Sequence, residues 1–559
     1  MFNGKADRWD FLISFSIGVF IFISILWTSD ITGLVRDEGF YMKAADIMAD
    51  WYESMEKSFS EGKFTEPFAS RTIKRYFTYN NEHPAFMKML YGSFLYIFHR
   101  KTELLSFVKS MRAVAALLAA LTAVMIYLFS IYTFSCRKTA VVSSMLFISM
   151  PHMFFHSHLV CFDVPVLFFW TLLFFLYARY IVKPSTWTAF ITAVVFGISM
   201  AVKHNVFFFP FLIFPIWVLF HFSNYSSLET KKRGISGFFR SVPLLFYLFP
   251  LVSLPVYLFH WPWLWYNTFH RFKAYIDFHV YHVNYTNYYF GQELARAPFP
   301  FSFPWVMTSF TTPLPQLVVF IAAVFLFAAV IFNRKTKSSH RHAIFALATG
   351  AFFPITLIAL PSVPIFGGIK HWFTAYPILI VMGTFPVVQG TNSLFEKKLK
   401  LKQKWAGFAS AIIFAVVLTS VSIPCIKFIK RGPAFFNTLA GGVQGAAEKQ
   451  MQRNFWGYDI MDLIDVLNEE APRNARVFIM SYAEGLNRNS FRFMKKEGML
   501  RNDLRAVNNL KKADMAFFFF EKQNEYVIYD IYEEFGTAVP LALSEVDSVL
   551  YSALFRREK

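Results

Sequence analysis

Long apolar runs follow one another from residue 11 to residue 425 of this 559-residue chain. A helix needs about 20 apolar residues to cross a bilayer, and most runs are close to that length. The pattern predicts eleven membrane spans, near residues 11–28, 111–133, 139–157, 163–178, 186–202, 205–222, 241–259, 313–332, 343–360, 372–390 and 405–425. The first run lacks a small-residue cleavage site, so we interpret it as an uncleaved anchor.

Composition supports this interpretation. Hydrophobic residues make up 55% of the chain and charged residues only 16%, far more apolar side chain than one water-soluble core needs. Basic residues gather in alternate loops: Arg137 and Lys138; Arg179 and Lys183; Lys231, Lys232, Arg233 and Arg240; Arg334, Lys335, Lys337 and Arg341; Lys397, Lys398, Lys400, Lys402 and Lys404. The positive-inside rule therefore predicts a cytoplasmic N-terminus. Contact of these loops with anionic membrane lipid explains the net charge of +19, so we expect no nucleic-acid partner.

One further apolar stretch, 84–98, is too short to span and holds Lys88 in its middle. If it were a span, every later loop would be inverted and the charge rule would fail. The sequence thus predicts an interfacial helix against the outer leaflet, within a first outer loop over 29–110.

The composition turns ordinary after about residue 426, with mixed charges and mixed patterns. Residues 458–470 show helical spacing, whereas 475–480 and 513–520 are typical of buried strands. We therefore predict a membrane domain over 1–428 and a small soluble α/β domain over 429–559, on the outer side.

Asp37 and Glu38 follow the first span, at the outer mouth of this topology. One interpretation is a solvated helix start, because acids favour helix N-termini. The other is acid–base chemistry at the bilayer surface, with Asp37 as a general base and Glu38 orienting Asp37 or the acceptor. Spacing alone does not separate the two.

A second polar group, Asn81-Glu82-His83-Pro84, precedes Lys88. Pro84 is well suited to begin the interfacial helix. Lys88 either reaches past apolar surface toward lipid phosphates or holds the phosphate of a lipid-linked substrate.

Three features occur in order: Asp37-Glu38 after the first span, His83-Pro84 with Lys88, and Met111-Arg112 at the start of an alanine- and leucine-rich span. Together they resemble glycosyltransferase family 39, the group of protein O-mannosyltransferases and aminoarabinose transferases. The resemblance implies a GT-C fold, here an α-helical polytopic membrane protein with about eleven spans and a C-terminal α/β periplasmic domain. It also implies the bacterial inner membrane.

Further outer turns continue the resemblance. Asp163 lies in a turn similar to the family's second outer loop, although His158 stands near the place where the family commonly has an arginine. The turns that contain Lys203 and Lys370-His371 are similar to turns whose basic residues approach a carrier phosphate. For each, the alternative is a charged or polar residue at a span end.

No Asp-x-Asp triplet and no glycine-rich phosphate loop occurs in the sequence, which disfavours a nucleotide-sugar donor held through a metal. We therefore expect no cofactor and no metal. The predicted partners are a polyprenyl-phosphate sugar, membrane lipid, and an acceptor that is a glycan, a lipid or a protein.

The predicted activity is an inverting glycosyl transfer, with Asp37 and Glu38 as catalytic residues. Carrier or substrate contacts are expected from His83, Lys88, Arg112, Asp163, Lys203, Lys370 and His371, with Lys88, Arg112 and Lys203 foremost at the phosphate. The alternative is a non-enzymatic flippase or transporter of lipid-linked glycans.

Overall fold

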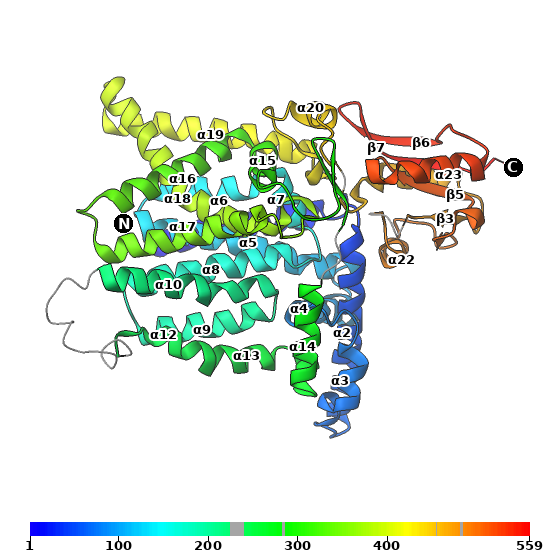
Figure 1. Ribbon diagram of the computed structural model, residues 1–559, viewed down its shortest axis with the longest axis horizontal. Helices are drawn as coiled ribbons and strands as arrows, with labels where there is room; N and C mark the ends of the chain where they lie inside the picture. The colour runs from blue at the N-terminus through cyan, green and yellow to red at the C-terminus, as the bar shows by residue number, and fades with distance from the viewer. Residues whose placement is uncertain (224–239, 282–284, 454, 481–484, 559) are drawn as a thin grey trace.

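A bundle of apolar helices dominates the computed structural model, which describes residues 1–223, 240–281, 285–453, 455–480 and 485–558 (Figure 1). Eight of the described helical segments are long and apolar enough to cross a membrane. The bundle is built from α1 (Arg8–Thr28), α5 (Phe107–Phe134), α6 (Arg137–Ile148), α7 (Pro151–His156), α8 (Asp163–Val182), α9 (Thr186–Met200), α10 (Phe208–Ser223), α12 (Leu244–Leu248), α13 (Leu254–Phe259), α16 (Leu314–Phe332), α17 (Ser338–Ala359), α18 (Tyr376–Ser393) and α19 (Gln403–Lys427). The polytopic helical fold is therefore confirmed.

Three of the eleven predicted spans are helical but shorter or interrupted. The run 139–157 breaks between α6 and α7, where Pro151 occupies the first turn of the second helix. The run 241–259 contains Pro250 and Pro255 and is divided by a π-helical turn over Phe249–Ser253. A proline removes one backbone hydrogen bond and disturbs the preceding turn, which hydropathy alone does not register. The third, α9, is regular but has only 15 residues.

The two ends of the bundle differ in charge. The N-terminus and the links α16–α17 and α18–α19 lie at one end, far from the C-terminal domain (Figure 1). At that end the Phe2 amide donates to the Thr133 carbonyl oxygen at 2.7 Å, and Lys138 Nζ donates to the Gly407 carbonyl oxygen at 2.9 Å. The predicted basic cluster Lys231, Lys232 and Arg233 lies outside the described residues. The described basic loops thus share an end, and a cytoplasmic position for that end stays a prediction.

A layer of helices crosses the opposite end of the bundle (Figure 1). It contains α2 (Arg36–Ser60), α3 (Ser70–Phe77), α4 (Phe86–Phe94), α14 (Thr268–Val280) and α15 (Phe303–Thr311), with the hairpin β1 (Asn287–Tyr289) and β2 (Gln292–Leu294). The interfacial helix expected over 84–98 is α4, continued by a π-helical turn over Leu95–Lys101. It is packed into the protein, because Gly92 allows α4 to approach α2 so closely that a Cβ there would lie 2.5 Å from Met48 Cβ.

The C-terminal region is a small α/β domain. It contains α20 (Gly442–Glu448), α21 (Ile464–Glu470), β3 (Arg476–Phe478), α22 (Arg488–Lys496), β4 (Arg505–Val507), β5 (Met515–Phe519), α23 (Glu525–Phe535), β6 (Ala542–Val546) and β7 (Val549–Arg556). The sheet order is β4-β3-β5-β7-β6, parallel among the first three strands and antiparallel thereafter. All five residues of the central strand β5 are buried, as the apolar run 513–520 indicated. This region adjoins the start of α2, where Ser490 Oγ donates to the Val35 carbonyl oxygen at 2.9 Å.

Candidate active site

A cavity of about 470 Å³ lies where the outer helical layer, the ends of the spans and the C-terminal region meet. Residues far apart in sequence share it: the first turn of α2, the segment around residue 80, the turn before α10, the end of α14 and the loop before α18. Five of the nine predicted site residues line it, namely Asp37, His83, Lys203, Lys370 and His371.

Asp37 lies in the first turn of α2 and is held by a cation from the other end of the sequence. Lys370 Nζ donates to Asp37 Oδ2 at 3.1 Å. The Lys370 ammonium also lies 4.4 Å from the centre of the Trp456 ring, a cation–π contact. Asp37 keeps part of its side chain accessible while Lys370 is largely buried. The carboxylate is thus oriented and still open to a substrate.

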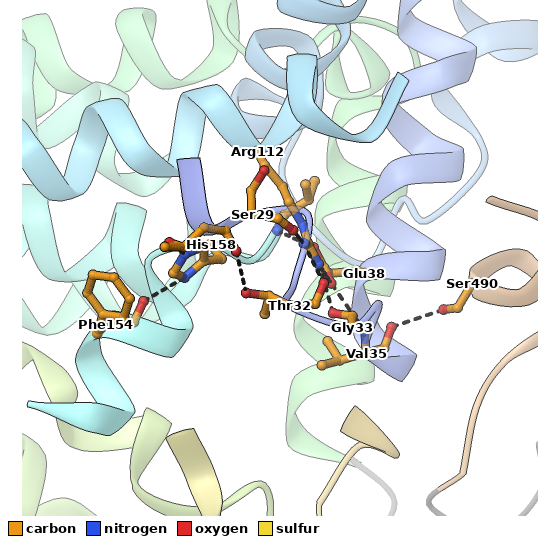
Figure 2. A network of polar contacts seen from close by, with 11 residues as sticks. Ser29, Thr32, Gly33, Val35, Glu38, Arg112, Phe154, His158 and Ser490 are labelled. Atoms are coloured by element: carbon orange, nitrogen blue, oxygen red, sulfur yellow. Dashed lines mark hydrogen bonds and ion pairs between the residues drawn. The ribbon is translucent and has the colours of Figure 1, made fainter. Parts of the chain in front are cut away.

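Glu38 and Arg112 form a buried ion pair instead of lining the cavity. Both side chains are 0% exposed, with Arg112 Nη2 2.8 Å from Glu38 Oε2 and Nε 3.1 Å from Oε1. Arg112 also donates to the carbonyl oxygens of Ser29, Thr32 and Gly33, as Figure 2 shows. Glu38 accepts two further bonds, from the amides of Val35 and Val160. Because the donors and acceptors are used inside the protein, we correct the expected roles: Arg112 is no phosphate ligand, and Glu38 does not contact the acceptor.

The Glu38–Arg112 ion pair determines the position of the backbone around it. It fixes the chain that leaves the first span and the first turn of α2 (Figure 2). That turn also carries Asp37, which lines the cavity. The nearby His158 is bound in the same network, with its Nε2 2.7 Å from Thr28 Oγ1 and its Nδ1 2.8 Å from the Phe154 carbonyl oxygen. It therefore does not take the place of a substrate-binding arginine.

Lys88 lies behind the cavity wall. Its side chain is buried, the residue is 3% exposed, and Nζ donates to the carbonyl oxygens of Asn80 at 2.6 Å and His83 at 2.8 Å. Burial lowers the pKa of Lys88 from 10.5 to about 7. The predicted phosphate contact is therefore corrected as well: Lys88 ties down the segment from which Asn80 and His83 reach the cavity.

Lys203, His83, His204 and His279 form one wall of the cavity. Lys203 Nζ is 3.2 Å from Asp163 Oδ1, and Asp163 Oδ2 is 3.8 Å from His156 Nδ1. Asp163 is buried outside the lining, so it acts as a support for Lys203, the structural role that its position at a span start allowed. The rings of His204 and His279 lie 4.0 Å apart between centres.

His83 completes this wall. Burial lowers the pKa of His83 well below its ordinary value, and the positive charges of Lys88 and Lys203 lower it further. A neutral imidazole can donate one hydrogen bond and accept another, so His83 is suited to a hydroxyl group rather than to a charge.

Several lining residues were missed as site residues. Arg36 precedes Asp37 directly, and its position beside the acid pair was the available signal. His279 comes from α14, and Phe455 and Trp456 come from the C-terminal region. No spacing pattern connects these residues to residue 37, because they meet only through long-range packing. Within the described part of the chain, no group of three His, Cys, Asp or Glu side chains is placed to hold a metal ion.

The architecture and the cavity define a polytopic membrane protein with a charged site at the end of its helical bundle. Residues 82–239 match the family model described as dolichyl-phosphate-mannose-protein mannosyltransferase. This segment includes His83, Lys88, Arg112, Asp163 and Lys203. Over this segment, the match bears out the resemblance to glycosyltransferase family 39, and with it the expectation of a glycosyltransferase.

Several solved structures are similar to this chain, and three of them share the following with it. The apo form of ArnT from Cupriavidus metallidurans has 12% identity and a TM-score of 0.48, with 97% of each chain covered. The form of that protein bound to undecaprenyl phosphate has 12% identity and a TM-score of 0.45, with 98% of each covered. The oligosaccharyltransferase from Archaeoglobus fulgidus has 13% identity and a TM-score of 0.42, with 90% of this chain and 63% of that chain covered. No curated protein sequence matches this chain.

Proposed function

We propose that this protein transfers a sugar from a polyprenyl-phosphate carrier to an acceptor, with inversion at the anomeric carbon. The main support is the single cavity that holds an accessible carboxylate, Asp37, together with the cations Lys203 and Lys370. A base for the acceptor and charges for a leaving phosphate are the two requirements of this chemistry. The matching family is named for a donor of this kind, a dolichyl-phosphate sugar.

The cavity has an apolar side as well. Phe208, Leu357 and Ile358, at the ends of α10 and α17, are among its lining residues. An isoprenoid chain fits between such residues from the lipid side while its phosphate stays near the lysines. A water-soluble nucleotide sugar would gain nothing from this apolar side.

The proposed step balances as a direct displacement. Asp37 accepts the proton of an acceptor hydroxyl or amine, and the new bond forms at the anomeric carbon. The bond from that carbon to the phosphate oxygen breaks, and polyprenyl phosphate leaves with the electron pair. Its charge increases in the transition state, so Lys203 and Lys370 stabilise the transition state more than the ground state. Lys203 thus has in this proposal the role first expected of it, and Lys370 takes the place of Lys88 and Arg112.

We place the cavity at the periplasmic face of a bacterial inner membrane, with the C-terminal domain on the same side and the N-terminus in the cytoplasm. The support is the gathering of the described basic loops at the far end of the bundle (Figure 1).

A transfer assay with the purified full chain tests the proposal. Proteoliposomes receive polyprenyl-phosphate sugars labelled in the sugar, with a membrane extract as the source of acceptor. We expect label to leave the carrier and polyprenyl phosphate to accumulate. Movement of intact labelled carrier between leaflets, without cleavage of the sugar–phosphate bond, would contradict the proposal and favour a flippase.

A further inference from the structure

A second cavity, of about 530 Å³, lies between the C-terminal domain and the outer hairpin. Its walls come from β1, α20 and the segment after it, the end of β5 and α23. None of the residues proposed for the chemistry lines it. Figure 1 shows the hairpin reaching α20 at the edge of the C-terminal domain.

Hydrogen bonds between its walls preform this cavity. The Tyr288 amide donates to Gln452 Oε1 at 3.1 Å, and the Gln452 amide donates to the Tyr288 carbonyl oxygen at 3.2 Å. The Gly291 amide donates to the Gln450 carbonyl oxygen at 3.2 Å. Because three hydrogen bonds, two of them between backbone groups, join the hairpin to the segment after α20, little ordering remains for a ligand to impose.

Aromatic rings form much of the lining. Tyr288, Tyr529 and Tyr532 present rings with polar tips, and Phe518 and Phe520 add apolar surface from the sheet. Tyr529 is 69% exposed, so its ring faces the open side of the cavity. A sugar ring has C–H faces and a rim of hydroxyls, and flat amphipathic side chains of this kind match both.

The charges of the cavity balance. The Arg453 guanidinium donates to the carbonyl oxygens of Leu550 and Phe520, and the Arg453 amide donates to Glu521 Oε1. Lys522 and Glu525 are the exposed charged residues of the lining, and they have opposite signs. This pattern does not favour an anion, in contrast to the first cavity with Arg36, Lys203 and Lys370. A neutral polyhydroxylated ligand fits better than a phosphate or an acidic head group.

The two cavities are neighbours along one short segment. Tyr285 lines the first cavity and Tyr288 the second. Three peptide steps separate their Cα atoms by at most about 11 Å. One short segment of the chain therefore borders both cavities.

From this arrangement we infer that the second cavity binds a neutral saccharide portion of the acceptor, so that the acceptor is a glycan or a glycan-bearing molecule. In naming the ligand as the acceptor, the inference rests on the proposed function. Saccharide binding itself does not depend on any transfer step.

Ligand-observed NMR with the full chain in detergent tests the inference. The probes are methyl glycosides of glucose, galactose, mannose and N-acetylglucosamine, and neutral tetrasaccharides of the same sugars. We expect saturation transfer to at least one series, and a loss of affinity of about tenfold or more in Tyr529→Ala and Tyr532→Ala, the size expected when an aromatic anchor is truncated. Tyr526→Ala is the matched control, because Tyr526 is exposed on the same helix but does not line the cavity.

Two results would overturn the inference: no saturation transfer to any of these saccharides at millimolar concentration, or binding that both cavity variants leave unchanged. Transfer of label to a peptide or lipid that carries no saccharide would also overturn the inference. The proposed function fails separately, when no donor is cleaved although saccharide still binds. If both hold, Tyr529→Ala should raise the acceptor KM by about tenfold and leave kcat near the wild-type value.

Discussion

Charged residues of this protein differ in what they are able to do, although they look alike in sequence. Asp37 and Glu38 are adjacent, yet the first lines a cavity and the second is fully buried against Arg112. Successive residues in a helix point about 100° apart, so one of two neighbouring acids can face the substrate while the other faces the core.

The Asp37→Asn variant should be folded and inactive. The amide keeps the size of the side chain but accepts no proton at neutral pH, so we expect sugar transfer to fall by at least about 100-fold. Release of labelled sugar from the carrier measures the effect. Asp50→Asn is the control, since Asp50 is an exposed acid on the same helix and should leave the rate unchanged. A normal rate in Asp37→Asn would remove Asp37 as the base.

The Glu38–Arg112 pair should govern stability. Removal of one partner leaves a buried charge without compensation, which costs about 3–5 kcal/mol. We therefore expect Glu38→Gln and Arg112→Met each to lower the melting temperature of the purified protein sharply. The double variant should lose less than the sum of the two.

The melting temperature and the donor KM of Arg112→Met together can contradict this prediction. If its melting temperature equals that of the wild type and only the donor KM rises, then Arg112 contacts the phosphate after all.

Lys88 should make stability depend on pH. Its pKa falls from 10.5 to about 7 on folding because of burial, so the unfolded chain binds more protons between those values. The cost of burying the ammonium is fully present below pH 7 and is relieved as the pH rises toward 10.5. Relative to Lys88→Met, the wild type should gain roughly 1.4 kcal/mol of stability per pH unit above 7.

Thermal unfolding of both proteins at pH 6, 7, 8 and 9 measures this gain. Lys57→Met, at an exposed position of α2, serves as the control and should show a constant difference from the wild type. A constant difference for Lys88→Met as well would mean that Lys88 stays protonated throughout.

At the level of elements, α14 joins the lipid surface to the cavity. Phe269, Phe272, Ile276 and Val280 repeat at helical spacing on its exposed side, and Phe269 is 92% exposed. Tyr275 and His279 point inward, with His279 lining the cavity. A helix with this division is suited to lie in the interface of a bilayer with its apolar side toward the acyl chains.

Spin labels on α14 test this position. In nanodiscs, a nitroxide at Phe269→Cys should be relaxed more strongly by oxygen than by a water-soluble nickel complex. The label at His270→Cys, an exposed position about 100° around the helix from Phe269, should show the reverse. Equal exposure of both labels to the nickel complex would mean that α14 lies in water.

The sequence predicted some of these elements and missed others, and both results have physical reasons. Apolar length locates a span wherever the helix is continuous, so α1, α5 and α19 lie where the runs placed them. It does not show where a proline such as Pro151 divides a run. Nor did it reveal α14, whose apolar stripe is mixed with charged residues in a long outer loop.

The candidate site was predicted in part for a related reason. Residues at the outer ends of the spans, such as Asp37, Lys203 and Lys370, lie by their position in the chain at the surface where the site forms. Whether a cation there is accessible or buried depends on partners distant in sequence. The Lys88 ammonium meets backbone carbonyls, and the Arg112 guanidinium meets an acid 74 residues away, contacts that no local pattern encodes.

For the whole molecule, the distribution of charge predicts the orientation. The described basic loops share one end of the bundle, and the candidate site lies at the other (Figure 1). In a background without the three native cysteines, Asn509→Cys should react with a membrane-impermeant maleimide on cells whose outer barrier has been opened. Lys400→Cys should react only after the inner membrane is permeabilised. The reverse pattern would place the site in the cytoplasm and contradict the proposed function.

The contacts of the C-terminal domain with the start of α2 also bear on biogenesis. Ser490 and Asn487 bind the carbonyl oxygens of Val35 and Arg36, the two residues before Asp37, and the Arg36 amide binds the Trp456 carbonyl oxygen. Ribosomes make the chain from its N-terminus, so these partners arrive more than 400 residues after the helix they hold. A nascent chain can insert its spans in order, but the carboxylate acquires its final setting only when residue 490 has been synthesised and exported. Activity should therefore appear with completion of the polypeptide rather than with insertion of its membrane domain.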